Sequence, residues 1–104
     1  MTGGERRVRV EGLFDLSGKL AVVTGARRGI GRSIAELLAA AGADIVGVSA
    51  QIDESGSEVQ DSVESTGRSF EAIQTDLSDE EQVHELASRL SRGQRPIDIL
   101  VNNA

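Results

Sequence analysis

The sequence predicts a doubly wound α/β fold, in which a parallel sheet carries helices on both faces. Four short apolar segments alternate with three segments of helical periodicity along the 104 residues. The connections between the apolar segments are too long for hairpins, so we expect parallel strands joined by right-handed crossovers. Hydrophobic residues make up 38% of the chain and charged residues 27%, which is typical of a globular domain rather than a disordered one.

The first predicted strand and helix flank a glycine-rich turn. Residues 19–24 (KLAVVT) form a short apolar run, as in a strand that is buried on both faces. Beyond the turn, apolar residues recur every three or four positions up to Ala41, which indicates an amphipathic helix. Gly42 is expected to follow the last helical turn in a left-handed conformation. Residues 44–49 (DIVGVS) are the second predicted strand.

The next helix and strand have weaker signals. Residues 51–57 are polar and are expected to form a loop. Val59 and Val63 mark a short helix that ends at Gly67, and residues 69–75 (SFEAIQT) are assigned to the third strand.

The third helix is predicted to begin with a capping box. Ser78 and Glu81 have the required spacing, so each side chain is expected to bond the other residue's free backbone amide. An apolar stripe follows at Val83, Leu86, Ala87 and Leu90. Pro96 then closes the connection to the fourth strand, residues 97–101 (IDILV).

Residues 1–17 are polar and irregular, and are predicted to be a flexible lead-in to a domain at 18–104. The formal net charge of −6 argues against binding to nucleic acid or anionic membranes. No apolar run approaches the roughly 20 residues of a membrane span, and no apolar segment follows the arginines at 6, 7 and 9 as in a signal peptide. We therefore expect a cytoplasmic protein.

Residue types that build metal and thiol sites are scarce. The chain has no cysteine and one histidine. These counts exclude a disulfide scaffold, a cysteine-ligated zinc site, a thiol nucleophile and a multi-histidine metal centre. No metal site is predicted.

The turn between the first strand and helix is the segment that indicates a chemistry. At the carboxyl end of a parallel strand, free amides and the helix dipole favour an anion such as phosphate. Glycines at 25, 29 and 31 permit a tight turn and a close approach of pyrophosphate to the backbone. Their spacing matches neither G-x-G-x-x-G nor a P-loop.

The turn does resemble the T-G-x-x-x-G-x-G motif of the short-chain dehydrogenase/reductase family. Asp76-Leu77 is similar to that family's Asp-Leu/Val pair beside the adenine, and residues 102–104 (NNA) resemble the start of its Asn-Asn-Ala-Gly motif. Residues 42–48 and 67–70 look like those of family members that act on 2-deoxygluconate and keto-deoxygluconate. The resemblance covers about residues 16–104.

The resemblance implies a Rossmann-like sheet of order 3-2-1-4, cut to β-α-β-α-β-α-β, that binds NAD or NADP. The pyrophosphate is expected over residues 29–31, and the residues of this turn expected to contact the cofactor are Thr24, Gly25, Arg27, Arg28, Gly29, Ile30 and Gly31. Those expected at the adenosine are Ser49 and Ala50 beside the ribose, and Asp76, Leu77 and Asn103 nearby.

The choice between NAD and NADP stays open at this stage. An acid after the second strand normally binds the ribose hydroxyls of NAD, whereas NADP needs a cation. Ser49 occupies the acid's position, and the first acid, Asp53, is too far along the loop. Arg27 and Arg28 favour NADP, but the sugar-acid dehydrogenases that the chain resembles commonly use NAD.

The family's catalytic Ser, Tyr-x-x-x-Lys and Asn would lie beyond the Asn-Asn-Ala motif. The 104 residues contain no tyrosine, and Lys19 is the only lysine. We therefore expect no catalytic residue here, and interpret the chain as the cofactor-binding part of an oxidoreductase of roughly 250 residues. The whole enzyme would take a small-molecule secondary alcohol or carbonyl, and would be a homo-oligomer. The alternatives are a non-catalytic dinucleotide-binding module and an inactive remnant.

Overall fold

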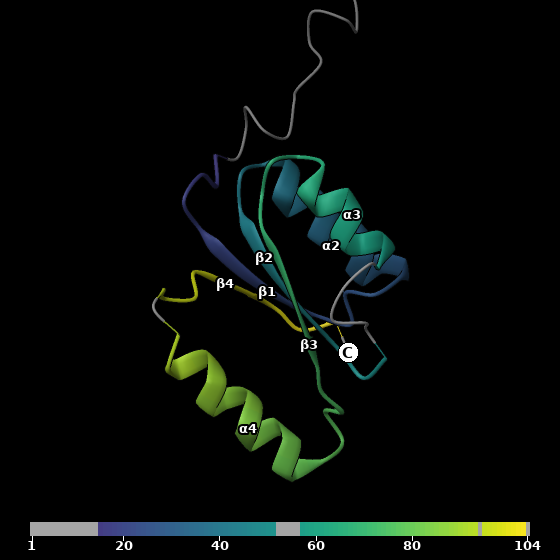
Figure 1. Ribbon diagram of the computed structural model, residues 1–104, viewed down its shortest axis with the longest axis vertical. Helices are drawn as coiled ribbons and strands as arrows, with labels where there is room; N and C mark the ends of the chain where they lie inside the picture. The colour runs from purple at the N-terminus through teal and green to yellow at the C-terminus, as the bar shows by residue number, and fades with distance from the viewer. Residues whose placement is uncertain (1–14, 52–56, 94, 104) are drawn as a thin grey trace, which may run out of the picture.

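A computed structural model describes residues 15–51, 57–93 and 95–103, which form a four-stranded parallel sheet with helices on both faces (Figure 1). The strands are β1 (Leu20–Thr24), β2 (Asp44–Ser49), β3 (Phe70–Gln74) and β4 (Ile99–Val101). The helices are α2 (Gly29–Ala40), α3 (Glu58–Glu64) and α4 (Glu80–Ser91). The strand order β3-β2-β1-β4 confirms the predicted fold class.

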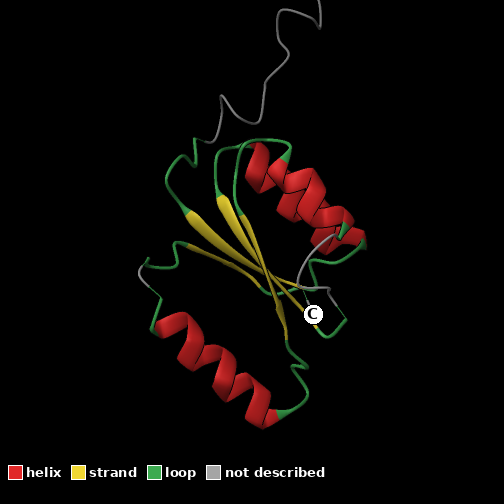
Figure 2. Cartoon of the chain, in the orientation of Figure 1, coloured by secondary structure: helices red, strands yellow, loops and turns green. Residues whose placement is uncertain are grey.

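Two apolar layers hold the helices to the sheet. Figure 2 shows α2 and α3 on one face and α4 on the other. Beneath α2 and α3, buried side chains of the sheet pack against Ala35, Ala39, Val59 and Val63. On the opposite face, Leu86 and Leu90 of α4 cover Val22, Val46, Val48 and Ile73. Because β1 and β2 are apolar on both sides, they form the centre of the sheet, as expected for a parallel sheet.

The fourth strand is shorter than predicted. The predicted segment began at Ile97, whereas β4 begins at Ile99. The Asp98 carboxylate accepts a hydrogen bond from the backbone amide of Leu20 (2.9 Å) in place of a strand carbonyl. The Asp98 amide still donates to the Leu20 carbonyl (3.0 Å), and the paired residues of β1 and β4 begin with Ala21 and Ile99.

Glycines follow two of the helices. Gly42 comes directly after Ala41, the C-cap of α2, and its φ is +113°, which confirms its predicted role. A Cβ atom there would lie 2.9 Å from the backbone nitrogen of Ser17, so a larger residue at this position would also clash with Ser17. Gly67 has a φ of +88°, but α3 already ends at Glu64, so the glycine belongs to the turn beyond the helix.

The predicted capping box at the start of α4 is wrong. The N-cap is Asp79, whose carboxylate accepts from the amides of Glu81 (3.0 Å) and Gln82 (3.4 Å). The Ser78 hydroxyl instead donates to Asp76 Oδ1 (2.6 Å). A carboxylate one residue later thus takes the amides that the serine was expected to bond.

The start of the described chain is attached to the domain. The backbone amide of Leu16 donates to the carbonyl of Ala41 (2.9 Å), and the Leu16 side chain packs against the layer beneath α2 and α3. Leu16 belongs to the predicted lead-in at 1–17, whose first 14 residues lie outside the described ranges. None of the helices in those ranges combines the length and apolar character of a membrane-spanning segment.

An ion pair joins the amino ends of the strands. Asp44 accepts a hydrogen bond from the amide of Ser69 (2.8 Å) and pairs with Arg95 (2.7 Å). The bond from Ser69 holds the pKa of the Asp44 carboxyl below its usual value; Arg95 acts in the same direction and burial opposes both. The ionised carboxylate therefore stabilises the fold at neutral pH, and this stabilisation is lost as the pH falls through the native pKa.

Replacing Asp44 with Asn should lower the free energy of unfolding by about 1 kcal/mol at pH 7. The difference from the unchanged protein should shrink as the pH falls below about 4, the ordinary pKa of an aspartate in an unfolded chain, toward the lower pKa of the native carboxyl. Urea denaturation at pH 7 and pH 3 measures both values, with Glu85→Gln as the control for loss of an exposed carboxylate. A difference that stays constant over this range would contradict the assignment.

Candidate functional site

The candidate site is a pocket at the carboxyl edge of the sheet, where the loops after β1, β2 and β4 meet. Its volume is about 350 Å³. The pocket is lined by Gly25, Arg27, Arg28, Ser49, Ala50, Gln51 and Asn103. Crevices of parallel α/β sheets bind ligands at this edge, next to the strand where the chain order reverses. Here that strand is β1, since β2 and β4 lie on either side of it.

Thr24 links the end of β1 to the end of β4 through hydrogen bonds beneath the pocket. Its hydroxyl oxygen accepts a hydrogen bond from the amide of Asn103 (2.8 Å) and lies 3.3 Å from the carbonyl of Val101. The same hydroxyl is 3.3 Å from Asn102 Oδ1. Thr24 is buried and does not line the pocket, so its position suits it to hold Asn103 opposite the glycine turn rather than to contact a ligand.

The glycine turn lies directly against the start of α2. Gly25 adopts a φ of +64°, and its amide donates to the carbonyl of Val48 (2.7 Å). A Cβ atom on Gly31 would lie 1.9 Å from the carbonyl oxygen of Gly25 and 2.7 Å from Asn103 Nδ2. Only glycine at position 31 therefore permits this approach, and it brings the first turn of α2 to the pocket.

The amino end of α2 is suited to an anion. Its N-cap is Arg28, which provides no side-chain hydrogen bond to the helix amides, and the first turn contains no acidic residue. Gly29 and Ile30 are exposed, and the Ile30 side chain is 72% exposed. The first amides of a helix carry partial positive charge and need an acceptor, so an anion bound here would gain from both effects.

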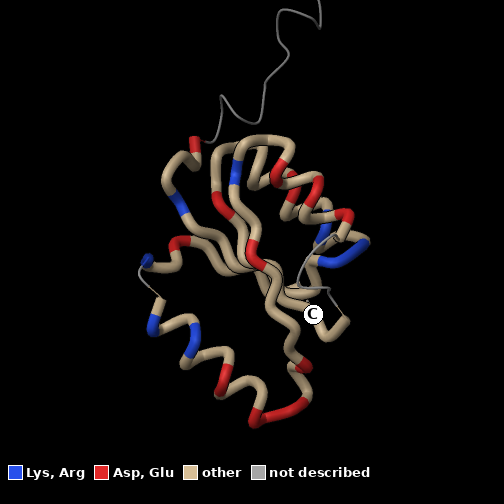
Figure 3. The backbone as a smooth tube through the Cα atoms, in the orientation of Figure 1, with Lys and Arg blue, Asp and Glu red and all other residues tan. Residues whose placement is uncertain are grey.

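The pocket is basic although the whole chain is acidic. Arg27 and Arg28 line it, and neither forms an ion pair with any described residue. Among the described residues that line it, none carries a carboxylate. Figure 3 shows basic positions at the loop before α2, whereas acidic positions lie along α3 and in the first part of α4. The local charge is thus opposite in sign to the net charge of −6.

The structure brings some of the predicted residues together and leaves others outside. Gly29, Ile30 and Gly31 start α2 beside the pocket without lining it. Asp76 and Leu77 follow β3 and also do not line it. Asp76 is exposed, and its hydrogen bonds from the Ser78 hydroxyl and amide hold the pKa of its carboxyl below the usual value.

Gln51 is a lining residue absent from the predicted site. It could have been found from its place in the chain, because polar residues directly after a central parallel strand lie at the ligand-binding edge. Asp53, which the sequence placed too far along the same loop, lies outside the described residues. So does Ala104, the last residue of the Asn-Asn-Ala segment.

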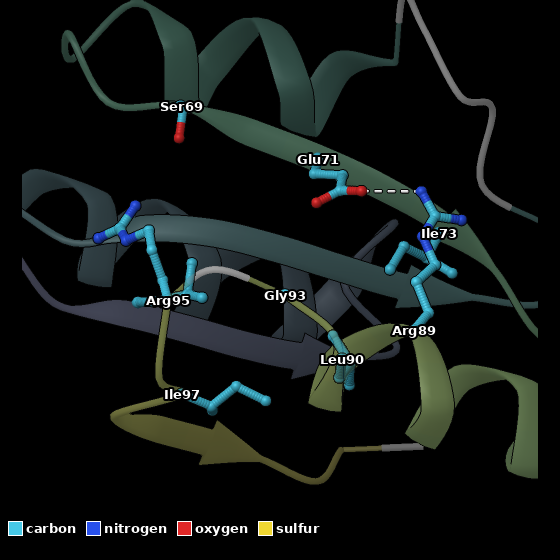
Figure 4. A pocket seen from close by; sticks show the side chains of 9 residues that line it. Ser69, Glu71, Ile73, Arg89, Leu90, Gly93, Arg95 and Ile97 are labelled. Carbon is cyan, nitrogen blue, oxygen red and sulfur yellow. Dashed lines mark hydrogen bonds and ion pairs between the residues drawn. The ribbon is translucent and has the colours of Figure 1, made fainter.

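A second pocket, of about 390 Å³, lies between α4 and the sheet (Figure 4). Leucine and isoleucine side chains form much of its lining. Its two arginines are already paired, Arg89 with Glu71 (2.8 Å) and Arg95 with Asp44 (2.7 Å). This pocket therefore offers a ligand no unpaired cation, in contrast to the pocket at the carboxyl edge. Within the described residues, no group of three or more acidic or histidine side chains is placed to hold a metal ion.

Comparison with known proteins agrees with the geometry of the carboxyl edge. The family model described as short chain dehydrogenase matches residues 19–104. The chain is 48% identical over 91 residues to 2-dehydro-3-deoxy-D-gluconate 5-dehydrogenase of Pseudoalteromonas atlantica, covering 88% of the chain and 36% of the relative. It is 50% identical to the Bacillus subtilis protein of the same name, covering 88% and 35%. The chain thus spans about a third of the length of these relatives.

Solved structures resemble the described fold. A putative short-chain alcohol dehydrogenase from Sinorhizobium meliloti superposes with a TM-score of 0.77 at 44% identity, over 88% of this chain and 36% of that one. Carveol dehydrogenase from Mycobacterium avium, solved with NAD, gives 0.71 at 33% identity, over 88% and 37%. Pseudomonas aeruginosa RhlG, solved with NADP, gives 0.70 at 38% identity, over 88% and 36%.

Proposed function

Because this chain belongs to the short-chain dehydrogenase family, we propose that residues 18–104 bind the dinucleotide cofactor of an oxidoreductase. The observation that carries the proposal is the basic pocket at the carboxyl edge of the sheet, next to the uncapped amino end of α2. A dinucleotide has an anionic pyrophosphate between two nucleosides, and that shape suits a helix terminus flanked by two loops.

We assign the pyrophosphate to the amino end of α2. The amides of Gly29, Ile30 and Gly31 would bind its oxygens, while Gly25 permits close approach because it has no side chain. Thr24 supports this arrangement from below through its bonds to β4. The nicotinamide ring supplies the hydride that passes to or from the substrate.

We assign the adenosine to the loops after β2, β3 and β4. Ser49 and Ala50, together with Gln51, would lie at the ribose. Asn103 lines the pocket opposite Gly25 and would contact the adenosine. Asp76 and Leu77 lie after β3, and would flank the adenine from outside the pocket.

Within this proposal, NADP is preferred over NAD. The 2′-phosphate that distinguishes NADP needs a cation, and Arg27 and Arg28 line the same pocket as Ser49. NAD binding normally uses a carboxylate for the ribose hydroxyls, and the lining residues within 15–51, 57–93 and 95–103 include none. The relatives' structures contain either cofactor, so the preference rests on these pocket residues.

Calorimetric titration with NADP⁺ and NAD⁺ tests both levels of the proposal. NADP⁺ should bind at least about tenfold more tightly, because charge-assisted bonds to the 2′-phosphate are worth about 1.5–3 kcal/mol. Equal affinities would refute the preference and leave dinucleotide binding intact. Binding of neither cofactor would refute the proposed function itself.

The substrate of the whole enzyme is proposed to be a sugar acid, oxidised at a secondary alcohol or reduced at a ketone. The support is the identity of 48% and 50% to proteins named for a deoxygluconate substrate. Reading the gene past codon 104 is the first test. A frame that continues with a serine and then Tyr-x-x-x-Lys supports the enzyme, whereas an immediate stop codon would leave cofactor binding as the only activity to measure.

A further inference from the structure

The side of the pocket formed by residues 49–51 is a short turn that leaves the sheet after β2. We call these three residues the pocket rim. Ser49, Ala50 and Gln51 all line the pocket, and Ala50 and Gln51 are exposed. A turn of this kind needs its backbone groups bonded if it is to keep one conformation.

Three hydrogen bonds hold the rim. The amide of Thr75 donates to the carbonyl of Ser49 (3.0 Å), which extends the ladder between β2 and β3 by one bond. The amide of Gln51 is 3.4 Å from the Ser49 hydroxyl, a long bond within the rim itself. The Gln74 side-chain amide donates to the carbonyl of Ala50 (2.9 Å).

The bond from Gln74 differs from the other two. It comes from a side chain that does not line the pocket, and it reaches the central residue of the rim from the neighbouring strand. Gln74 pairs directly with Ser49 in the register of β2 and β3, so its side chain lies next to the point where the rim begins. The side chain is exposed, and so its loss leaves no cavity in the core.

We propose that Gln74 is a positioning residue that fixes the pocket rim for the ribose and 2′-phosphate of the cofactor. This inference rests on the proposed function, which places the adenosine ribose against Ser49 and Ala50. A rim that is already ordered loses less conformational entropy when the ligand binds. The affinity for the ligand therefore depends on the hydrogen bond from Gln74 to Ala50, although Gln74 does not contact the ligand.

Gln74→Met tests the inference, because methionine has a similar length and no hydrogen-bond donor. Affinity for 2′,5′-ADP, which fills the ribose end of the site, should fall about threefold to tenfold, the range expected for one lost hydrogen bond. Affinity for inorganic pyrophosphate, which the amino end of α2 is proposed to hold, should change less than about twofold. Calorimetry measures both ligands, and thermal denaturation checks that the melting temperature is kept.

Gln60→Met is the matched control, since Gln60 lies on α3, bonds to Glu64 and does not line the pocket. It should leave both affinities unchanged. Unchanged 2′,5′-ADP binding in Gln74→Met would overturn the inference, and so would an equal loss for both ligands or a fall in melting temperature, which would mean a general structural role. If the unsubstituted protein binds neither ligand, the proposed function fails first, and that result is distinct from the others.

Discussion

Alanine at position 31 should abolish dinucleotide binding and destabilise the whole domain. The added Cβ atom would lie 1.9 Å from the carbonyl oxygen of Gly25 and 2.6 Å from its carbonyl carbon. Both are backbone atoms in a turn that is bonded to β2, so they cannot rotate away as a side chain could. We expect a loss of about 3 kcal/mol or more in the free energy of unfolding, at the upper end for overpacking.

Gly29→Ala provides a matched control two residues away. A Cβ atom there meets nothing within 4 Å, and the only cost is its φ of +63°. A left-handed residue costs about 1–2 kcal/mol when it is not glycine. Urea denaturation of both variants compares the stability lost through the Cβ contact at position 31 with the stability lost through backbone strain at position 29. If the two variants are equally stable, the close approach between Gly25 and Gly31 is not what requires glycine at position 31.

Replacing Arg28 with Gln should weaken NADP⁺ binding about tenfold to a hundredfold, and Arg27→Gln tests the second arginine of the pocket in the same way. Both arginines line the same pocket as Ser49, where the ribose and its 2′-phosphate are proposed to lie. Binding of NAD⁺ should change less than about threefold, because NAD lacks the 2′-phosphate. Titrations at two salt concentrations should also show a weaker salt dependence in the variant.

Arg92→Gln is the control for the arginine series. Arg92 is exposed at the end of α4, so the variant has the same net charge as Arg28→Gln without altering the pocket. It should bind both cofactors as the unsubstituted protein does. If Arg28→Gln weakens the affinity for NAD⁺ and for NADP⁺ by the same factor, the arginine binds the pyrophosphate, and the proposed preference for NADP is wrong.

Features set by uninterrupted apolar runs were predictable from the sequence, and features set by competition between polar groups were not. The strands around Val22 and Val46 are buried on both faces, so composition alone identified them. The start of α4 depended on which of two adjacent residues, Ser78 or Asp79, would accept the helix amides. The start of β4 depended on whether the Asp98 side chain would replace a backbone partner. Such choices are decided by tertiary geometry.

The candidate site shows the same division. The predicted Gly25, Arg28, Ser49 and Asn103 line one pocket although they come from three separate parts of the chain. The parallel topology explains this, since every strand delivers its carboxyl end to one edge. Thr24 was predicted as a ligand contact, and in the structure its hydroxyl bonds to the Asn103 amide and does not line the pocket. The side of the sheet on which a side chain lies at the end of a strand depends on how that strand is aligned with its neighbours. The glycine-rich motif that begins at Thr24 does not specify this alignment.

The position of β1 between β2 and β4 has a consequence for the order in which the domain is made. β1 pairs with β2 some 24 positions later, since Leu20 lies opposite Asp44, but its bonds to the β4 side span 77 to 79 positions. During synthesis, β1, β2 and β3 can form a sheet before β4 is available to pair with the other edge of β1. The Thr24 hydroxyl can meet the Asn103 amide only after almost all of these residues have left the ribosome. The pocket at the carboxyl edge is therefore completed after β1, β2 and β3 have been made, and the proposed cofactor cannot stabilise the nascent sheet before then.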